Sequence, residues 1–214
     1  MSAIVKICGL STPPTVRAAI DGGAGFVGFV VFDKSPRNVT PELAAQLAEP
    51  ARAAGVKVVA VTVDPSDVLL ESLRATLAPD FIQLHGQETP ARVRDAAAKA
   101  GAGVIKAIPV AAAGDLNAAA VYEPLVDHLM FDARPPEGSG TPGGVGAKFD
   151  WSLLSGRKFD HPWFLAGGLD PWNVTEAIAA SGAPMVDVSS GLERGPGLKD
   201  PGLISAFLDA VRRA

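Results

Sequence analysis

The sequence predicts a single α/β domain over residues 1–214 that folds as a (β/α)8 barrel, also called a TIM barrel. Short apolar runs rich in Val and Ile alternate with longer Ala-rich stretches of helical composition. There are eight such pairs with short connections, which is the pattern of a closed parallel sheet covered by helices. The length of 214 residues and the 48% apolar content suit one large core. An open doubly wound sheet is the alternative, and it is disfavoured because no Gly-x-Gly-x-x-Gly turn follows the first apolar run.

The predicted elements follow one another in a regular order. A Pro-Pro pair opens the first helix and a Gly-Gly pair ends it. Thr40 can cap a helix that begins at Pro41, and Gly55 ends that helix. We expect strands at residues 3–8, 26–32, 56–63, 81–84, 104–110, 128–131, 163–166 and 185–188. We expect helices at residues 13–20, 41–55, 66–77, 90–100, 116–122, 150–154, 171–180 and 201–213, and a long Gly-rich loop at 135–146.

Composition narrows the range of partners. The net charge is −4 and no basic run is present, so binding of nucleic acid has no electrostatic support. No apolar run approaches the roughly 20 residues that span a bilayer, and no secretory signal is visible at the N-terminus. With one cysteine in the chain, a reducing cytoplasm is the simplest location. We therefore expect a cytoplasmic protein with a small-molecule ligand and with no nucleic-acid or membrane partner.

Polar side chains recur near the ends of the predicted strands. Alternate residues of a strand share a face, and the inward face of a barrel is normally apolar, so polar residues there need a reason. The polar sets are Lys6 with Cys8, Gln83 with His85, Lys106, His128 with Asp132, and Asp187 with Ser189. If these faces point inward, Lys6, Lys106, Asp132 and Asp187 converge, and we predict ion pairs among them because unpaired buried charges are unfavourable. The alternative is that some of them point outward as solvated positions, and for Lys106 both readings stay open.

Two glycine-bearing loops are typical of an anion site. Gly167 and Gly168 follow the seventh strand, and Ser190 and Gly191 follow the eighth. In barrels the loops after these two strands commonly bind phosphate through backbone N–H groups, although glycines also make plain turns. Together the loops predict a phosphate-bearing ligand.

Two further loops, the histidines and the cysteine each allow both a functional and a purely structural interpretation. Arg37, after the second strand, could hold a carboxylate in a bidentate fork or could simply be exposed to solvent. The loop 135–146 is either a mobile lid over the site or a surface loop without a function. Three histidines are present without zinc-site spacing, so we expect no metal. Cys8, as a lone thiol, is either a small core residue or a chemical group.

With these residues assembled, the chain resembles the phosphoribosylanthranilate isomerases of tryptophan biosynthesis. The resemblance extends along the full length, and its first and last motifs together are specific to that family. The matching stretches are Lys6-Ile7-Cys8-Gly9, Phe32 through Ser35-Pro36-Arg37, Gln83-Leu84-His85-Gly86, Asp132, Phe149-Asp150-Trp151, Ala166-Gly167-Gly168-Leu169 and Asp187 through Glu193. One departure is Val145, where the family usually has threonine.

The resemblance implies a cofactor-free Amadori rearrangement of N-(5-phosphoribosyl)anthranilate to 1-(2-carboxyphenylamino)-1-deoxyribulose 5-phosphate. It implies that Asp132 protonates the furanose ring oxygen and that Cys8 removes the proton from C2. Lys6, or charge on the bound substrate, would lower the pKa of Cys8 from about 8.5. Asp132 would need an apolar or anionic setting to stay protonated.

The resemblance also implies substrate-binding residues. Arg37 would hold the anthranilate carboxylate, and the phosphate would bind Gly167, Gly168, Ser190 and Gly191. Asp187 would orient that loop or pair with a lysine.

Three rival readings remain from the residues. The histidine-pathway aldose-ketose isomerase handles phosphate similarly but has an aspartate where Cys8 stands. A pentose-phosphate epimerase would need metal-ligand histidines at strand ends, and only His85 is a candidate. A non-catalytic barrel that senses a phosphorylated metabolite would have no need for Cys8 together with Asp132.

Overall fold

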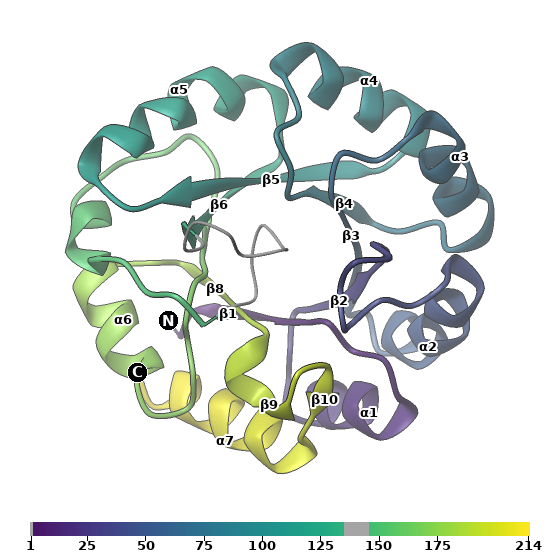
Figure 1. Ribbon diagram of the computed structural model, residues 1–214. Helices are drawn as coiled ribbons and strands as arrows, with labels where there is room; N and C mark the ends of the chain where they lie inside the picture. The colour runs from purple at the N-terminus through teal and green to yellow at the C-terminus, as the bar shows by residue number, and fades with distance from the viewer. Residues whose placement is uncertain (1, 135–145) are drawn as a thin grey trace.

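Eight parallel strands form a closed barrel, with each strand hydrogen-bonded to its neighbours in sequence and the eighth to the first, as Figure 1 shows along the barrel axis. The computed structural model describes residues 2–134 and 146–214. The strands are β1 Ile4–Cys8, β2 Phe26–Val30, β3 Lys57–Thr62, β4 Phe81–Leu84, β5 Gly103–Val110, β6 His128–Ala133, β7 Phe164–Leu165 and β8 Met185–Val188. The predicted fold class is confirmed.

Helices surround the ring of strands (Figure 1). They are α1 Pro13–Asp21, α2 Pro41–Ala53, α3 Asp67–Thr76, α4 Pro90–Ala100, α5 Ala119–Tyr122, α6 Val174–Ser181 and α7 Pro201–Arg212. Side-chain caps explain several starts: the oxygens of Thr40, Ser66 and Thr89 each accept a hydrogen bond from an amide of the first turn. In the residues that the structure describes, no helix is long and apolar enough to cross a membrane.

The strand residues divide into two apolar layers. Outward-facing side chains pack against the helices in the larger cluster, which includes Ile7, Val27 and Leu84. Inward-facing side chains form a second cluster inside the barrel, which includes Phe26, Met130 and Phe164. This division follows the two-residue period of a strand.

Aromatic rings fill the amino-terminal end of the barrel. The rings of Phe26, Phe81, His128 and Phe164 contact one another with centroids 5.3 to 6.2 Å apart. His128, which the strand pattern placed on an inward face, therefore belongs to this aromatic layer. Polar inward residues lie nearer the carboxyl ends of the strands, where the cavity described below opens.

Some elements differ from the prediction. The expected helix 116–122 is the 3-10 turn η1 Ala113–Ala118 followed by α5 and η2 Glu123–Leu125, and the short helix near 150–154 is the 3-10 turn η3 Trp151–Leu154. Helix α6 begins three residues later than predicted, because residues 171–173 form turns held by the side chains of Asp170 and Asn173. The prediction missed a hairpin after β8, formed by β9 Glu193–Gly195 and β10 Leu198–Lys199.

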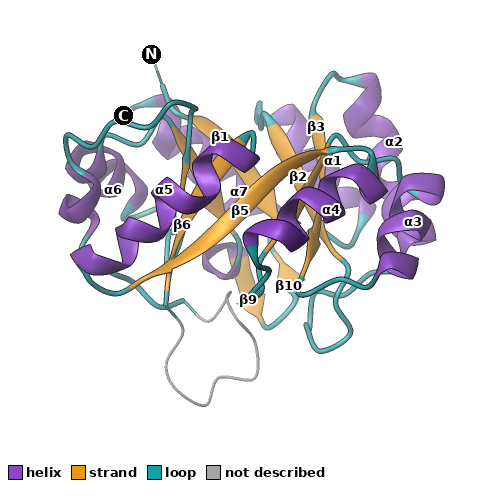
Figure 2. Ribbon diagram, turned by 90° about the horizontal axis from the view of Figure 1, so that it is seen from above, coloured by secondary structure: helices purple, strands orange, loops and turns teal. Residues whose placement is uncertain are grey.

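The hairpin lies at the carboxyl end of the barrel, the same end from which the chain leaves β6 (Figure 2). Residues 135–145, which include Val145 and nearly all of the expected loop 135–146, lie outside the described residues.

Lys106 does not enter the barrel interior. Its neighbours on β5, Ile105 and Ala107, belong to the inner cluster, so Lys106 faces the helices. It is buried there and its ammonium donates to Glu88 at 2.9 Å and to two backbone carbonyls. The convergence predicted for Lys106 is therefore wrong. The alternative, that Lys106 points outward, is right about the direction of the side chain. It is wrong about solvation, because the ammonium is buried and paired with Glu88.

Candidate active site

A cavity opens at the carboxyl ends of the strands, with an empty volume of about 800 Å³ including the part open to solvent. It is lined by side chains and loops that follow most of the strands. Among the predicted site residues it contains Cys8, Arg37, Asp132, Gly167, Gly168, Asp187 and Ser190. Gly191 does not line it. Polar residues that line the cavity without a predicted binding role include Gln83, His85 and Ser189.

Cys8 is the last residue of β1, and it is the one cysteine of the chain. It is buried, and its place in the inner cluster puts it in the barrel and at the cavity wall. Burial raises the pKa of the thiol, and the charge of Asp187 adds to the rise, although Lys6 and Lys199 act to lower it. Lys6 therefore acts on the thiol in the expected direction, but in the ligand-free protein burial outweighs it and the pKa of Cys8 lies above its usual value.

Lys6 and Asp187 form an ion pair inside the barrel. They occupy opposite positions in the register of β1 and β8, and the Lys6 Nζ lies 2.7 Å from Asp187 Oδ1. Gly28 makes room for the pair, because a Cβ at that position would lie 3.1 Å from Lys6 Nζ. Burial acts to lower the pKa of Lys6, but Asp187 and Cys8 outweigh it, so the pKa lies above its usual value. The predicted ion pair is confirmed for these two residues.

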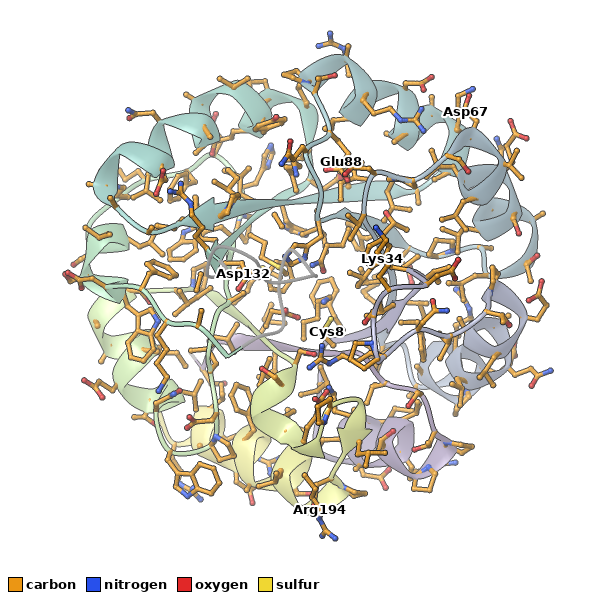
Figure 3. The ribbon with its side chains drawn as sticks, in the orientation of Figure 1. Cys8, Lys34, Asp67, Glu88, Asp132 and Arg194 are labelled. Carbon is orange, nitrogen blue, oxygen red and sulfur yellow. The ribbon has the colours of Figure 1, made fainter. Side chains whose placement is uncertain are left out.

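Asp132, on β6, faces the cavity from another part of the barrel wall. Figure 3 shows Cys8 and Asp132 near the centre of the barrel, and Glu88 farther out. Asp132 Oδ2 lies 3.0 Å from His85 Nε2, and His85 Nδ1 lies 2.8 Å from Gln83 Nε2. Asp132 therefore lies at the cavity end of a chain of three side chains. The period-two pattern put Gln83 and His85 on one face but gave them no role.

Arg37, in the loop after β2, is buried beside a carboxylate. Its Nε and Nη2 donate to the two oxygens of Glu193 at 2.7 and 2.9 Å. Glu193 also pairs with Lys199, whose ammonium donates to Ser189 Oγ at 3.3 Å. Burial acts to raise the pKa of Glu193, but the two cations outweigh it and hold the pKa below its usual value.

This cluster of two cations and one carboxylate carries a net positive charge at the cavity. Burial lowers the pKa of Lys199, although Glu193 opposes the change. The solvent-exposed alternative for Arg37 is wrong. The sequence analysis missed Lys199 and the pairing of Glu193, because both depend on the unpredicted hairpin β9–β10.

The two loops require glycine for different structural reasons, a positive φ angle in one and a close backbone contact in the other. Gly167 and Gly168 have φ angles of +87° and +63°, which side chains rarely adopt. Gly191 lies against the loop after β7, and a Cβ there would lie 2.0 Å from the carbonyl oxygen of Leu169. Gly191 therefore allows the loops after β7 and β8 to touch, while Ser190, at the start of the 3-10 turn η4 Ser190–Leu192, reaches the cavity.

Metal-binding side chains do not cluster in the part of the chain that the structure describes. Within residues 2–134 and 146–214, no group of three or more His, Cys, Asp or Glu side chains is arranged to hold a metal ion.

Comparison with known proteins gives a consistent result. A family model described as N-(5'phosphoribosyl)anthranilate (PRA) isomerase matches residues 5–210. The N-(5'-phosphoribosyl)anthranilate isomerase of Caulobacter vibrioides is 68% identical over 209 residues, which are 98% of this chain and 95% of that protein. The protein of the same name from Rhodospirillum centenum is 50% identical over 97% of both chains.

Solved structures agree with the sequence relatives. The phosphoribosyl anthranilate isomerase of Thermotoga maritima superimposes with a TM-score of 0.86 at 33% identity, over 99% of this chain and 100% of that one. A structure of phosphoribosyl anthranilate isomerase in complex with reduced 1-(o-carboxyphenylamino)-1-deoxyribulose 5-phosphate has a TM-score of 0.83 at 30% identity, over 99% of this chain and 100% of that one. A family model that matches nearly the full length, with relatives this similar, shows that the chain belongs to the N-(5'-phosphoribosyl)anthranilate isomerase family.

Proposed function

We propose that Cys8 and Asp132 are the base and the acid with which this isomerase rearranges N-(5-phosphoribosyl)anthranilate in tryptophan biosynthesis. The observation that carries the assignment is that a thiol from β1 and a carboxyl from β6 line one cavity at the carboxyl ends of the strands. An aldose-ketose rearrangement needs a proton donor at the ring oxygen and a proton acceptor at C2. Two groups on different parts of the cavity wall can serve the two atoms of one sugar.

The proposed sequence of steps conserves protons. Asp132 gives a proton to the furanose oxygen, the C1–O bond breaks, and a cationic Schiff base forms between C1 and the anthranilate nitrogen. Cys8, as thiolate, takes the proton from C2, and the C2–H electron pair forms the double bond of an enolamine. Protonation of C1 and loss of the C2 hydroxyl proton then give the aminoketose.

The thiolate has to form in the presence of substrate, because burial keeps Cys8 protonated in the free protein. Two lysine ammonium groups, Lys6 and Lys199, already act to lower the pKa of the thiol. The cationic Schiff base would add a third positive charge next to the sulfur. Positive charges near a cysteine favour the thiolate, so ring opening would prepare the base for the next step.

The ends of the substrate have separate proposed sites. The net positive cluster of Arg37, Glu193 and Lys199 suits the anthranilate carboxylate. The phosphate would lie at Gly167, Gly168, Ser190 and Gly191, with Gly191 acting through loop packing. Asp187 would take part through its pair with Lys6. The solved relative in complex with a reduced deoxyribulose phosphate supports a phosphate-bearing ligand in this family. We also propose that the enzyme acts in the cytoplasm, because a chain with one cysteine suits a reducing compartment. Its net charge of −4 supports the absence of a nucleic-acid partner.

The catalytic assignment is tested with Cys8→Ala and Asp132→Asn. Each change should lower kcat roughly a hundredfold or more, because general acid–base catalysis contributes about 10²–10⁴. The measurement is the loss of substrate fluorescence with EDTA present, and thermal melting checks the fold. Ser155→Ala, on an exposed turn outside the cavity, is the matched control and should keep wild-type kcat. Near-normal turnover in either site variant removes that residue from the mechanism.

A further inference from the structure

Gln83 carries an unusual feature for a buried amide. Its side chain is buried in the barrel, where Nε2 approaches His85 Nδ1 at 2.8 Å and Met130 Sδ at 3.4 Å. Its other polar atom, Oε1, is buried without a hydrogen-bond partner among the residues that the structure describes. A buried amide oxygen left unpaired costs about 1–3 kcal/mol, so its orientation needs an explanation.

The amide determines the tautomer of His85. An amide nitrogen can only donate, so His85 Nδ1 has to accept and carries no proton. The ring proton is then on Nε2, which lies 3.0 Å from Asp132 Oδ2 and donates to it. In this arrangement Asp132 Oδ2 is an acceptor and carries no proton, which is the form in which that oxygen has already given up its proton.

A half turn of the same amide produces the other form. Oε1 would then face His85 Nδ1 and accept a proton from it, so the unpaired oxygen would gain a partner. With Nδ1 protonated, His85 Nε2 and Asp132 Oδ2 can share one additional proton between them. The pair would hold one proton more than before, which is the loaded form of the acid.

We propose that Gln83 is a positioning residue whose amide orientation sets how many protons the His85–Asp132 pair holds. The oxygen faces His85 when the pair is loaded, and the nitrogen faces His85 after the proton has passed to the ring oxygen of the substrate. The pair is reloaded from solvent when the next substrate enters the open cavity. This inference rests on the proposed role of Asp132 as the acid.

Two variants of similar shape separate the proposal from simple packing. Gln83→Glu keeps the shape and presents only acceptor atoms to His85 Nδ1. Gln83→Met keeps the length and removes both hydrogen-bonding functions. Gln46→Met, on the exposed face of α2, is the matched control for a glutamine without this contact. Thermal melting shows whether each variant is folded. If one of the two Gln83 variants fails to fold, the other still tests the proposal.

The first readout is the protonation of the His85 ring, by long-range ¹H–¹⁵N NMR of the full-length protein with labelled histidine. The chain has three histidines, and the His85 signals are those lost in His85→Asn. We expect the Nε2–H tautomer in the free wild type and in Gln46→Met, and a protonated Nδ1 in Gln83→Glu. The second readout is kinetic: Gln83→Met should lower kcat by about tenfold or more, with KM within about twofold of wild type.

Two results would overturn the proposal: an Nε2–H tautomer in Gln83→Glu as in the wild type, or an unchanged kcat in Gln83→Met. The NMR result does not depend on turnover, so it is separate from a failure of the acid assignment. That failure would appear as near-normal activity in Asp132→Asn.

Discussion

Lys6 is among the largest fully buried side chains of the described residues, and its charge is balanced by one partner. We predict that Lys6→Met lowers the free energy of unfolding by about 3–5 kcal/mol, because the change leaves the carboxylate of Asp187 buried and unpaired. Urea unfolding at neutral pH measures this difference. The double variant Lys6→Met/Asp187→Leu should recover part of the loss, since no buried charge then remains in the pair. A double variant as unstable as the sum of both single changes would contradict the argument.

Two guanidinium nitrogens of Arg37 donate side by side to the two carboxylate oxygens of Glu193, and the proposed function of Arg37 depends on this bidentate geometry. Arg37→Ala should raise KM by roughly tenfold to a hundredfold with a smaller effect on kcat, because hydrogen bonds to charged groups contribute about 1.5–3 kcal/mol. Arg37→Lys should not restore KM, because a lysine cannot form the two parallel bonds that Glu193 now accepts. Steady-state kinetics on both variants makes the test. An unchanged KM in Arg37→Ala would place the carboxylate elsewhere.

How far single residues could be predicted depended on whether their partners were predictable. Cys8, Asp132 and Asp187 were placed correctly in the cavity, because the two-residue period of a strand and the carboxyl-end rule of barrels determine direction and position together. Lys106 was ambiguous, because one strand has two faces and both are covered in a barrel. The roles stated for these residues remain predictions.

Asp80 joins strands β3 and β4 at their amino-terminal ends. Its carboxylate accepts the Val58 amide at 2.8 Å and the Lys57 ammonium at 3.0 Å. Burial acts to raise the pKa of Asp80, but these hydrogen bonds outweigh it and the pKa lies below its usual value. A carboxyl whose pKa is lower in the folded state stabilises the fold above its unfolded-state pKa, about 3.9, and loses that effect as pH falls through the folded value.

We therefore predict that Asp80→Asn destabilises the protein by about 1 kcal/mol near neutral pH. The difference from wild type should shrink as the pH is lowered through the pKa of Asp80, because the wild-type carboxyl is then protonated too. Urea unfolding at several acidic pH values and at neutral pH measures the trend. Asp127→Asn serves as the comparison. The carboxylate of Asp127 accepts the Val104 amide at the start of β5, as Asp80 accepts the Val58 amide, but among the described residues it has no ion pair with a lysine. A difference that stays constant over the whole pH range would contradict the linkage.

Among the elements, strands were predicted more reliably than the segments that follow them. The barrel strands contain apolar runs that signal burial, so all eight were recognised. Hairpin β9–β10 has strands of only three and two residues, Glu-Arg-Gly and Leu-Lys, which carry no such signal. Because Glu193 and Lys199 lie on this hairpin, the partners of Arg37 could not be predicted either. A local sequence pattern does not indicate a short hairpin of this kind, because ion pairs between residues distant in the sequence stabilise it.

The molecule as a whole separates structural and chemical tasks along the barrel axis. Aromatic rings fill the amino-terminal end, and the side chains at the carboxyl end come from many different strands and loops. The Lys6–Asp187 pair lies between β1 and β8, where the barrel closes. A ligand in the cavity therefore contacts segments from the beginning, middle and end of the chain. Its binding energy should stabilise the entire barrel and not one loop.

This arrangement leads to a prediction about global stability. Reduced 1-(o-carboxyphenylamino)-1-deoxyribulose 5-phosphate, the ligand of a solved relative, should stabilise this protein by about 2.7 kcal/mol at a hundred times its Kd. For a chain of this length that corresponds to a rise in Tm of roughly 5–10 °C. In Arg37→Ala the same ligand concentration should give a rise about half as large, because a tenfold weaker Kd removes about 1.4 kcal/mol. Differential scanning calorimetry with and without ligand measures both. A ligand-induced rise equal in wild type and Arg37→Ala would show that the cluster around Arg37 does not bind the carboxylate.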